Sequence, residues 1–251
     1  MDYPMRMTSR LIGGLFVFLV ALGGIGITAS LGLWQLDRAQ QKESMARERQ
    51  SRAAETELDA RVLDPSVWSK DRQDELLHRR IRVTGHWHAE HTVYLENRQM
   101  HGRPGFLVLT PLRLEGSNMT ILVQRGWVPR HFLDRTALPD IQTPSGLVTL
   151  QGRLAPWPSR IYDFGGQDLG PIRQNLDWSA YRLQTRLDLA ESSLLQTGDD
   201  SEGLQRAWPD TASGVEKHRG YALQWFALSG LIALLYVWFQ IVRPRRKRPL
   251  P

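Results

Sequence analysis

The sequence predicts an α+β membrane protein in which two transmembrane helices flank a mostly antiparallel β domain, a small barrel or sheet, outside the cytoplasm. Two long uncharged runs, at residues 11–36 and 220–242, are each long enough to cross a bilayer as a helix. Between them, residues 79–196 contain short segments of alternating apolar and polar residues separated by turn residues, which is typical of antiparallel strands. These features indicate one extracytoplasmic domain, residues 37–219, held between two anchors.

The first anchor follows a short tail, residues 1–10, which carries Arg6 and Arg10. A cleaved signal peptide is the alternative interpretation, but the apolar region of a signal peptide has only about 7–15 residues and ends at a small-x-small site. The run at 11–36 is longer and shows no convincing cleavage site. We therefore expect a retained transmembrane helix.

The second anchor, residues 220–242, is followed by a basic tail, residues 243–251. Trp225, Tyr236 and Trp238 lie toward the ends of this anchor, where aromatic rings prefer the membrane interface. The tail supplies most of the net charge of +6 through five cations: Arg243, Arg245, Arg246, Lys247 and Arg248. Because cations favour the cytoplasmic side, both termini are predicted in the cytoplasm and residues 37–219 in the periplasm of a bacterial inner membrane.

The segment between the anchors changes its pattern along the chain. Residues 37–61 are rich in helix formers and predict a helical extension of the first anchor. Residues 106–114 and 119–128 predict a hairpin, because four turn residues separate two alternating runs. Further on, residues 172–175 and 187–196 predict two strands with a short helix at 178–186 between them.

Composition excludes several classes of function. The sequence pI of about 10.0 reflects the basic tail, and no nucleic-acid-binding motif is present, so we expect no nucleic acid partner. The chain contains no cysteine, which rules out disulfides and thiolate chemistry and is compatible with a bacterial periplasm. Neither a Gly-x-Ser-x-Gly elbow nor a phosphate-binding loop occurs, and no Ser, His and Asp stand out as a catalytic triad.

Three histidines, His86, His88 and His91, form a cluster on a predicted strand. The first two share a face, so a metal site is conceivable, with Glu90 as the carboxylate nearby. Short motifs of this kind often match by chance. We therefore favour the interpretation that these histidines hold no metal.

Polar and aromatic residues also gather at the outer boundary of both predicted spans. His218, Tyr221 and Trp225 share a face of the second helix, and Trp34 and Arg38 lie one turn apart on the first. An antiparallel helix pair would bring the two groups to the same depth. There they could hold a flat amphiphilic ligand, with histidine bound to a metal and arginine to carboxylates, or they could be ordinary interfacial anchors. The residues alone favour anchoring.

Two pairs of small residues predict where the helices pack together. Gly26 and Ser30 on the first helix, and Ser229 and Ala233 on the second, have the small-x-x-x-small spacing that permits close approach.

Four ordered motifs resemble the Surfeit-locus-one family, in particular its bacterial branch. Residues 31–38 (LGLWQLDR) with Lys42 are similar to the Trp-Gln-x-x-Arg-x-x-x-Lys signature of this family, and residues 122–129 (LVQRGWVP) are similar to its Val-Asn-Arg-Gly-Trp-Val-Pro strand, with Gln124 where asparagine is usual. Residues 171–177 (PIRQNLD) and 218–226 (HRGYALQWF) complete the set. Together these motifs extend over nearly the whole chain.

The resemblance implies an assembly factor, and not an enzyme, for haem-copper cytochrome c oxidase that binds haem a and assists its insertion into oxidase subunit I. It implies that His218 is the axial ligand, so that any metal is held through the haem iron only. Tyr221 and Trp225 on the same helix face, and Trp34 and Arg38 on the first helix, are further haem-binding candidates by position alone. The resemblance does not change the interpretation that Trp34 and Arg38 are structural. The expected partners are oxidase subunit I, the haem a synthesis machinery and the lipid bilayer. A haem-independent scaffold for an oxidase intermediate and a membrane-tethered periplasmic enzyme remain alternatives. The motif at Arg125–Trp127 is interpreted as domain core or docking surface.

Overall fold

The computed structural model describes residues 5–63, 70–134, 137–162, 170–208 and 214–246, and these divide into two compact units. One unit combines Met1–Arg47 with Asp210–Pro251, and the other is Glu48–Pro209. The first four residues of the N-terminal tail and residues 247–251 of the basic tail lie outside the described residues. The predicted fold class is confirmed, since two long apolar helices flank a β domain in the sequence.

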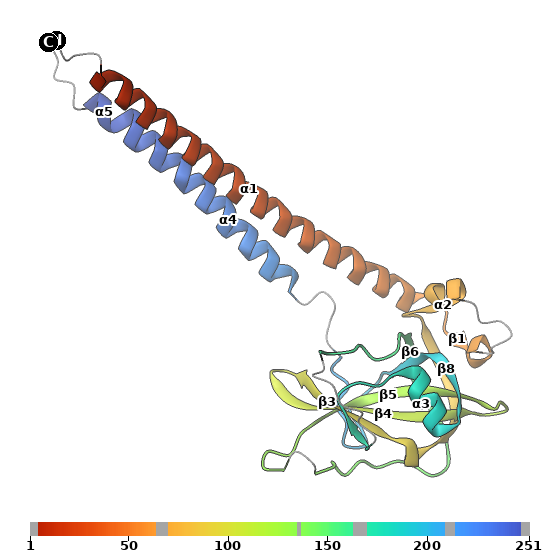
Figure 1. Ribbon diagram of the computed structural model, residues 1–251. Helices are drawn as coiled ribbons and strands as arrows, with labels where there is room; N and C mark the ends of the chain where they lie inside the picture. The colour runs from red at the N-terminus through yellow and green to blue at the C-terminus, as the bar shows by residue number, and fades with distance from the viewer. Residues whose placement is uncertain (1–4, 64–69, 135–136, 163–169, 209–213, 247–251) are drawn as a thin grey trace. The chain divides into compact units, whose positions relative to one another are not determined.

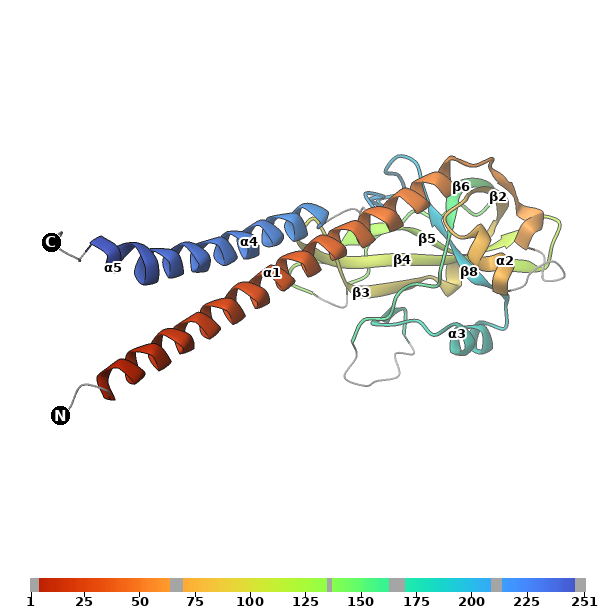
Figure 2. The same cartoon turned by 90° about the horizontal axis from the view of Figure 1, so that it is seen from above.

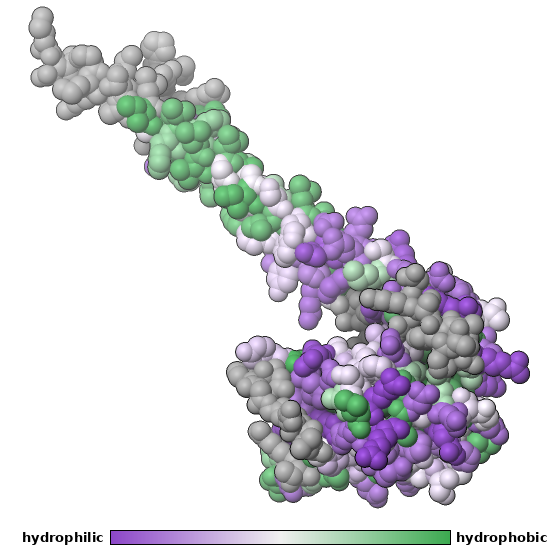
Figure 3. Space-filling model, turned by 45° about the vertical axis from the view of Figure 1, so that its right-hand side comes forward, coloured by the Kyte–Doolittle hydropathy of each residue, from purple (hydrophilic) through white to green (hydrophobic). Residues whose placement is uncertain are grey.

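The first unit is built from two helices that lie side by side and antiparallel (Figure 1). Helix α1 spans Met5–Ala54, and helix α4 spans Val215–Val237 and continues through a π-helical segment, Trp238–Val242, into α5, Arg243–Arg246. Both α1 and α4 are long and apolar enough to cross a membrane. Hydrophobic side chains cover a continuous stretch of this unit (Figure 3), as expected of helices that face lipid.

The buried positions of the two helices repeat at heptad spacing. On α4 these are Val215, Ala222 and Ser229, and Gly32 and Ala39 repeat in the same way on α1, where Thr28 is also buried one turn before Gly32. A regular seam of this kind is the pattern of two helices that wrap around each other. Seams with small residues allow the two backbones to approach closely.

The seam differs from the predicted one on α1. Gly26 and Ser30 are exposed, whereas Thr28 and Gly32 are buried. Gly32 packs closely against Phe226, because an added Cβ would lie 2.8 Å from its ring and the ring would have to shift. The prediction that Gly26 and Ser30 form the contact face of α1 was therefore wrong. Several small residues in this run have the same spacing, so the spacing alone does not identify the face. On α4 the prediction holds for Ser229, whose Oγ donates a hydrogen bond to Ile25 O at 3.3 Å.

The second unit contains a closed five-stranded barrel. Strand β2 closes it by pairing with both β4 and β6, and the ring continues from β4 to β5, β8 and back to β6. All neighbours in the ring are antiparallel except β5 and β8, which are parallel. This order is that of a five-stranded Greek-key barrel of the OB type, an architecture that does not by itself specify a function. The strands are β2 (Arg80–Trp87), β4 (Arg103–Leu114), β5 (Met119–Pro129), β6 (Leu147–Ala155) and β8 (Asp188–Gln196).

Smaller elements cover the barrel (Figure 2). Strand β3 extends the sheet beyond β4 and carries β7 on its outer side, while β1 pairs in parallel with β2. The predicted hairpin is confirmed as β4 and β5, and the predicted strand–helix–strand order is confirmed as β7, α3 and β8. These elements are β1 (Leu58–Asp59), η1 (Ala60–Leu63), α2 (Lys70–Leu76), η3 (Ala89–His91), β3 (Val93–Met100), β7 (Ile172–Arg173) and α3 (Trp178–Thr185).

Helix α1 ends at Ala54, before the expected end of the helical extension at Arg61. The chain leaves the helix because Leu58 and Asp59 pair with β2. Near this end, Arg52 donates hydrogen bonds to the carbonyl groups of Asp74 and Glu75, and Arg79 forms an ion pair with Glu55 at 3.0 Å. Pairing with the sheet thus overrides the local helix propensity.

Apolar side chains fill the barrel and both of its covered faces. The interior cluster includes Ile81, Leu112, Ile121 and Leu194, all fully buried. A second cluster packs under α3 around Tyr181, whose hydroxyl donates to the carbonyl group of His91. Burial raises the pKa of Tyr181 because it disfavours the charged phenolate.

A β-bulge in strand β5 directs Arg125 into the interior. Gly126 pairs with Val108 and Gln124 with Leu109, so Arg125 is the additional residue between them. Its side chain is fully buried and its guanidinium lies 4.7 Å from the centre of the Trp87 ring. The motif at Arg125–Trp127 therefore belongs to the domain core and not to an exposed docking surface.

Arg125 shares a carboxylate with a second buried arginine. Glu202 lies 3.0 Å from Arg125 and 3.4 Å from Arg206, and Arg206 also donates to the carbonyl group of Arg125 at 2.9 Å. Arg125 further donates to Gln142 O and Thr143 Oγ1, both at 2.7 Å. This network ties the segment that follows β8 to the barrel.

Candidate functional site

The candidate site lies in the helix unit, where the two membrane-edge motifs meet. His218 Nδ1 lies 2.7 Å from Gln35 Oε1 across the helix pair. Both residues are half-buried, and their seam neighbours Ala39 and Ala222 are buried. The expectation that an antiparallel pair brings the two groups to one depth is therefore supported. Gln35 was not among the predicted site residues, although it stands next to Trp34 in the motif.

Trp34 and Arg38 form a separate pair on α1. The guanidinium carbon of Arg38 lies 5.7 Å from the centre of the Trp34 ring, within cation–π range. Arg38 also donates to Gln41 Oε1 at 2.9 Å, and both Trp34 and Arg38 are exposed. The interactions found for these two side chains therefore lie on α1 itself, whereas His218 bonds across to Gln35.

The three predicted residues of α4 differ in their exposure. His218 and Trp225 are half-buried, whereas Tyr221 is 52% exposed. The residue of that face which packs fully against α1 is Ala222. The structure thus brings His218 and Trp225 to the helix interface and leaves Tyr221 on the outer surface.

A hollow borders the site on the side of the helix pair that carries Arg219. Its volume is about 410 Å³, and it is lined by Leu36, Ala39, Gln40, Glu43, Ser44, Arg47 and Arg219. Arg219 forms an ion pair with Glu43 across the helices and a second one with Glu216 at 3.1 Å. This cross-helix ion pair was not predicted, because pairing between different helices has no local sequence signal.

The donor atoms at the helix interface fit a haem ligand set. Among the described residues, His218 Nε2 has no hydrogen-bond partner, so this nitrogen is available to a metal. Imidazole nitrogen is a common axial ligand of haem iron, and the half-buried indole of Trp225, two turns further along α4, has an apolar ring face. Arg38 provides a guanidinium group that can meet a carboxylate, whereas Arg219 is already paired with Glu43 and Glu216.

The histidine cluster of the β unit does not form a metal site within the described residues, where no group of three suitable side chains is close enough to hold an ion. His88 Nδ1 lies 3.1 Å from Glu90 Oε1, and the rings of His88 and His91 are 6.1 Å apart. His86 is exposed.

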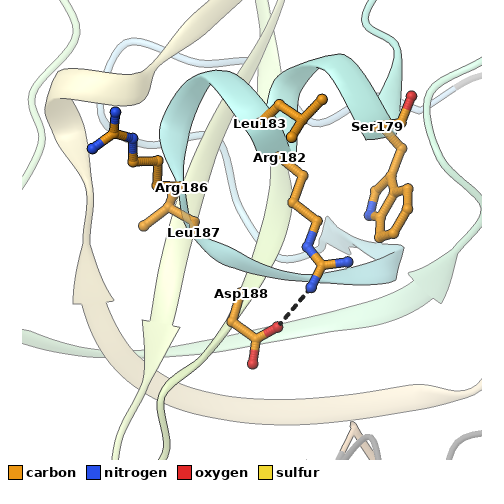
Figure 4. A pocket seen from close by; sticks show the side chains of 7 residues that line it. Ser179, Arg182, Leu183, Arg186, Leu187 and Asp188 are labelled. Carbon is orange, nitrogen blue, oxygen red and sulfur yellow. Dashed lines mark ion pairs between the residues drawn. The ribbon is translucent and has the colours of Figure 1, made fainter.

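A larger hollow, of about 660 Å³, lies beside α3 in the β unit (Figure 4). Arg182 and Asp188 both line it and form an ion pair at 3.6 Å. The guanidinium carbon of Arg182 also lies 5.3 Å from the centre of the Trp178 ring. None of the predicted site residues lines this hollow, and its paired charges satisfy each other. It therefore does not compete with the helix interface as the candidate site.

Comparisons with known proteins agree with the motifs at the site. The sequence model of the SURF1 family matches residues 22–230. A SURF1-like protein of Rickettsia felis is 25% identical over 88% of this chain and 96% of its own length, and one of Rickettsia conorii is 26% identical over 85% and 87%. The yeast cytochrome oxidase assembly protein SHY1 is 25% identical over 41% of this chain and 25% of its own length.

Proposed function

The chain belongs to the SURF1 family, and on this basis we propose that it assists the assembly of a haem-copper cytochrome c oxidase. The match over residues 22–230 is the observation that carries this proposal, because it includes both membrane-edge motifs and the whole β unit. The yeast relative bears the name of an oxidase assembly protein. We propose the same kind of role for this chain by homology, as an assembly factor and not as an enzyme.

We further propose that the protein is anchored in a bacterial inner membrane with both termini in the cytoplasm. Two apolar helices and the cations after Val242 support this topology. Reporter fusions after Arg248 and in the turn at Gly116 should give opposite results, with periplasmic activity at Gly116. Cytoplasmic activity at Gly116 would contradict the topology.

The cargo that fits the helix interface best is haem a, presented to oxidase subunit I after receipt from the haem a synthesis machinery. His218 would hold the iron through Nε2, Trp225 would cover part of an apolar face, and Arg38 would meet a carboxylate. Tyr221 and Trp34 are exposed at the same membrane edge and could contact the ring from outside the seam. Haem a itself would supply the redox-active iron of the oxidase.

The experiment is to purify the full-length protein after co-production with haem a synthesis enzymes and to measure the haem-to-protein ratio and the visible spectrum. Wild type should carry haem a, and His218→Ala should lose it while remaining in the membrane. His101→Ala is the matched control, because His101 is an exposed residue of the turn between β3 and β4. Equal occupancy and an unchanged spectrum in His218→Ala would exclude His218 as the ligand.

A haem-independent scaffold is the second candidate function. It is favoured by the contact between His218 and Gln35, which gives the histidine a structural role without any ligand. If this alternative holds, wild type purified with an ample haem a supply carries no haem, yet still copurifies with oxidase subunit I. Copurification that persists in His218→Ala would agree with it.

A further inference from the structure

The polar contact between His218 and Gln35 joins residues that are far apart in the sequence. Nδ1 of the imidazole and Oε1 of the amide are 2.7 Å apart, a normal hydrogen-bond distance. Both side chains are half-buried between α1 and α4, and Ala39 (4% exposed) and Ala222 (1% exposed) pack nearby in the seam. Because these neighbours are small, the two helices approach closely enough for the amide of Gln35 to reach the ring of His218.

The orientation of the amide decides which ring nitrogen can bind a metal. An amide oxygen only accepts, so in this arrangement Nδ1 carries the hydrogen and donates it to Gln35. In a neutral imidazole, Nε2 then keeps a free lone pair. With the amide reversed, its NH₂ group would donate to Nδ1, the hydrogen would sit on Nε2, and that nitrogen could not coordinate iron.

We infer that Gln35 is a positioning residue that holds His218 in the Nδ1–H tautomer and fixes the plane of its ring, so that Nε2 is presented to haem iron. This inference rests on the proposed function, since it names the partner that prepares the proposed ligand. Metal-bound histidines commonly donate their second N–H to an oxygen acceptor, which orients the ring and increases its basicity. Here the acceptor comes from the other helix, so ligand geometry depends on helix pairing.

The first test needs no haem. Full-length protein labelled with ¹⁵N-histidine is reconstituted in micelles, and the ring nitrogens of His218 are assigned by comparison with His218→Ala. We expect a hydrogen-bearing Nδ1 and a free Nε2 in wild type, and a mixture of tautomers in Gln35→Leu. Gln50→Leu is the control, because Gln50 is an exposed glutamine on the same helix.

The second test uses haem a and a conservative rescue. Loss of an outer-shell partner of a metal ligand commonly costs about 10–100-fold in affinity, and we expect Gln35→Leu to weaken haem a binding by that factor. Gln35→Glu restores an acceptor oxygen and should recover binding. It should also raise the iron–histidine stretching frequency of the reduced complex, since a carboxylate makes the imidazole a stronger donor. A purely structural role for Gln35 would not move this frequency.

The outcomes separate the two proposals. A free Nδ1 and a protonated Nε2 in the wild-type protein would overturn the inference, as would equal haem affinity and identical spectra in wild type and Gln35→Leu. If wild type binds no haem but shows the expected tautomer, the haem-carrier function fails while the positioning of His218 by Gln35 stands. A lower melting temperature in Gln35→Leu without rescue by Gln35→Glu would assign Gln35 to packing alone.

Discussion

Removal of the charge on Glu202 should destabilise the β unit strongly. This carboxylate lies 3.0 Å from Arg125 and 3.4 Å from Arg206, and the side chains of those arginines are only 0% and 2% exposed. Glu202→Gln keeps the shape of the side chain but leaves two buried guanidinium groups without their shared countercharge. The remaining acceptors around Arg125, Gln142 O and Thr143 Oγ1, are uncharged.

The magnitude follows from burial. Removing one partner of a buried ion pair costs about 3–5 kcal/mol. Glu202 is itself 20% exposed, so water can compensate part of the loss, and we expect the lower end of the range, about 3 kcal/mol. For a chain of this size, each kcal/mol of lost stability lowers the melting temperature by about 2–4 °C, so we expect a melting temperature lower by about 6–12 °C.

The assay is thermal unfolding of the full-length protein in detergent, followed by tryptophan fluorescence and near-ultraviolet circular dichroism. Glu191→Gln is the matched control, because Glu191 is an exposed carboxylate on β8. Arg206→Gln should lower the melting temperature less in the Glu202→Gln background than in the wild type, because in that background Arg206 has already lost its charged partner. A melting temperature of Glu202→Gln equal to that of the control would refute the reasoning.

Three further predictions follow from single contacts. Gly126→Ala should lower the stability of the β unit by about 1–3 kcal/mol, because the added Cβ would lie 2.8 Å from the Cβ of Leu204. An unchanged melting temperature would show that the segment around Leu204 can move away. Because burial raises the pKa of Tyr181, its contribution to the stability of the β unit should be intact below about pH 10 and fall above it. The urea midpoint should therefore decline with pH less steeply in Tyr181→Phe than in wild type, and equal slopes for the two proteins would contradict this. Glu43→Gln and Arg219→Gln should each weaken the helix pair, and a double-mutant cycle of melting measurements should give a coupling of about 0.2–1 kcal/mol between them; a coupling of zero would exclude the ion pair as a stabilising contact.

The sequence by itself determined the elements whose signals are carried by consecutive residues. The uncharged runs at 11–36 and 220–242 are helices because such length and composition leave no other way to satisfy the backbone in lipid. The hairpin of β4 and β5 was predicted because alternation and four turn residues specify it locally. The membrane-edge motifs were found in the same way, and His218 and Gln35 do meet at one depth.

The tertiary structure decided which distant segments pair. Closure of the barrel requires β2 to bond to both β4 and β6, and β5 to run parallel to β8, and no local pattern encodes these registers. Likewise, Arg125 has the sequence context of an ordinary strand residue, and only the bulge turns it inward. The helix end at Ala54 was missed because pairing of Leu58 with β2 competes with a local propensity that continues beyond it.

The same division applies to the site. Sequence spacing placed His218, Tyr221 and Trp225 on one face, but the packing of α1 against Ala222 decided that Tyr221 stays 52% exposed while His218 turns toward Gln35. Helical periodicity fixes the angle between side chains on one helix and leaves open which side of that helix meets its neighbour. That choice depends on the fit of small residues such as Gly32 against Phe226, a contact between residues that only the folded chain brings together.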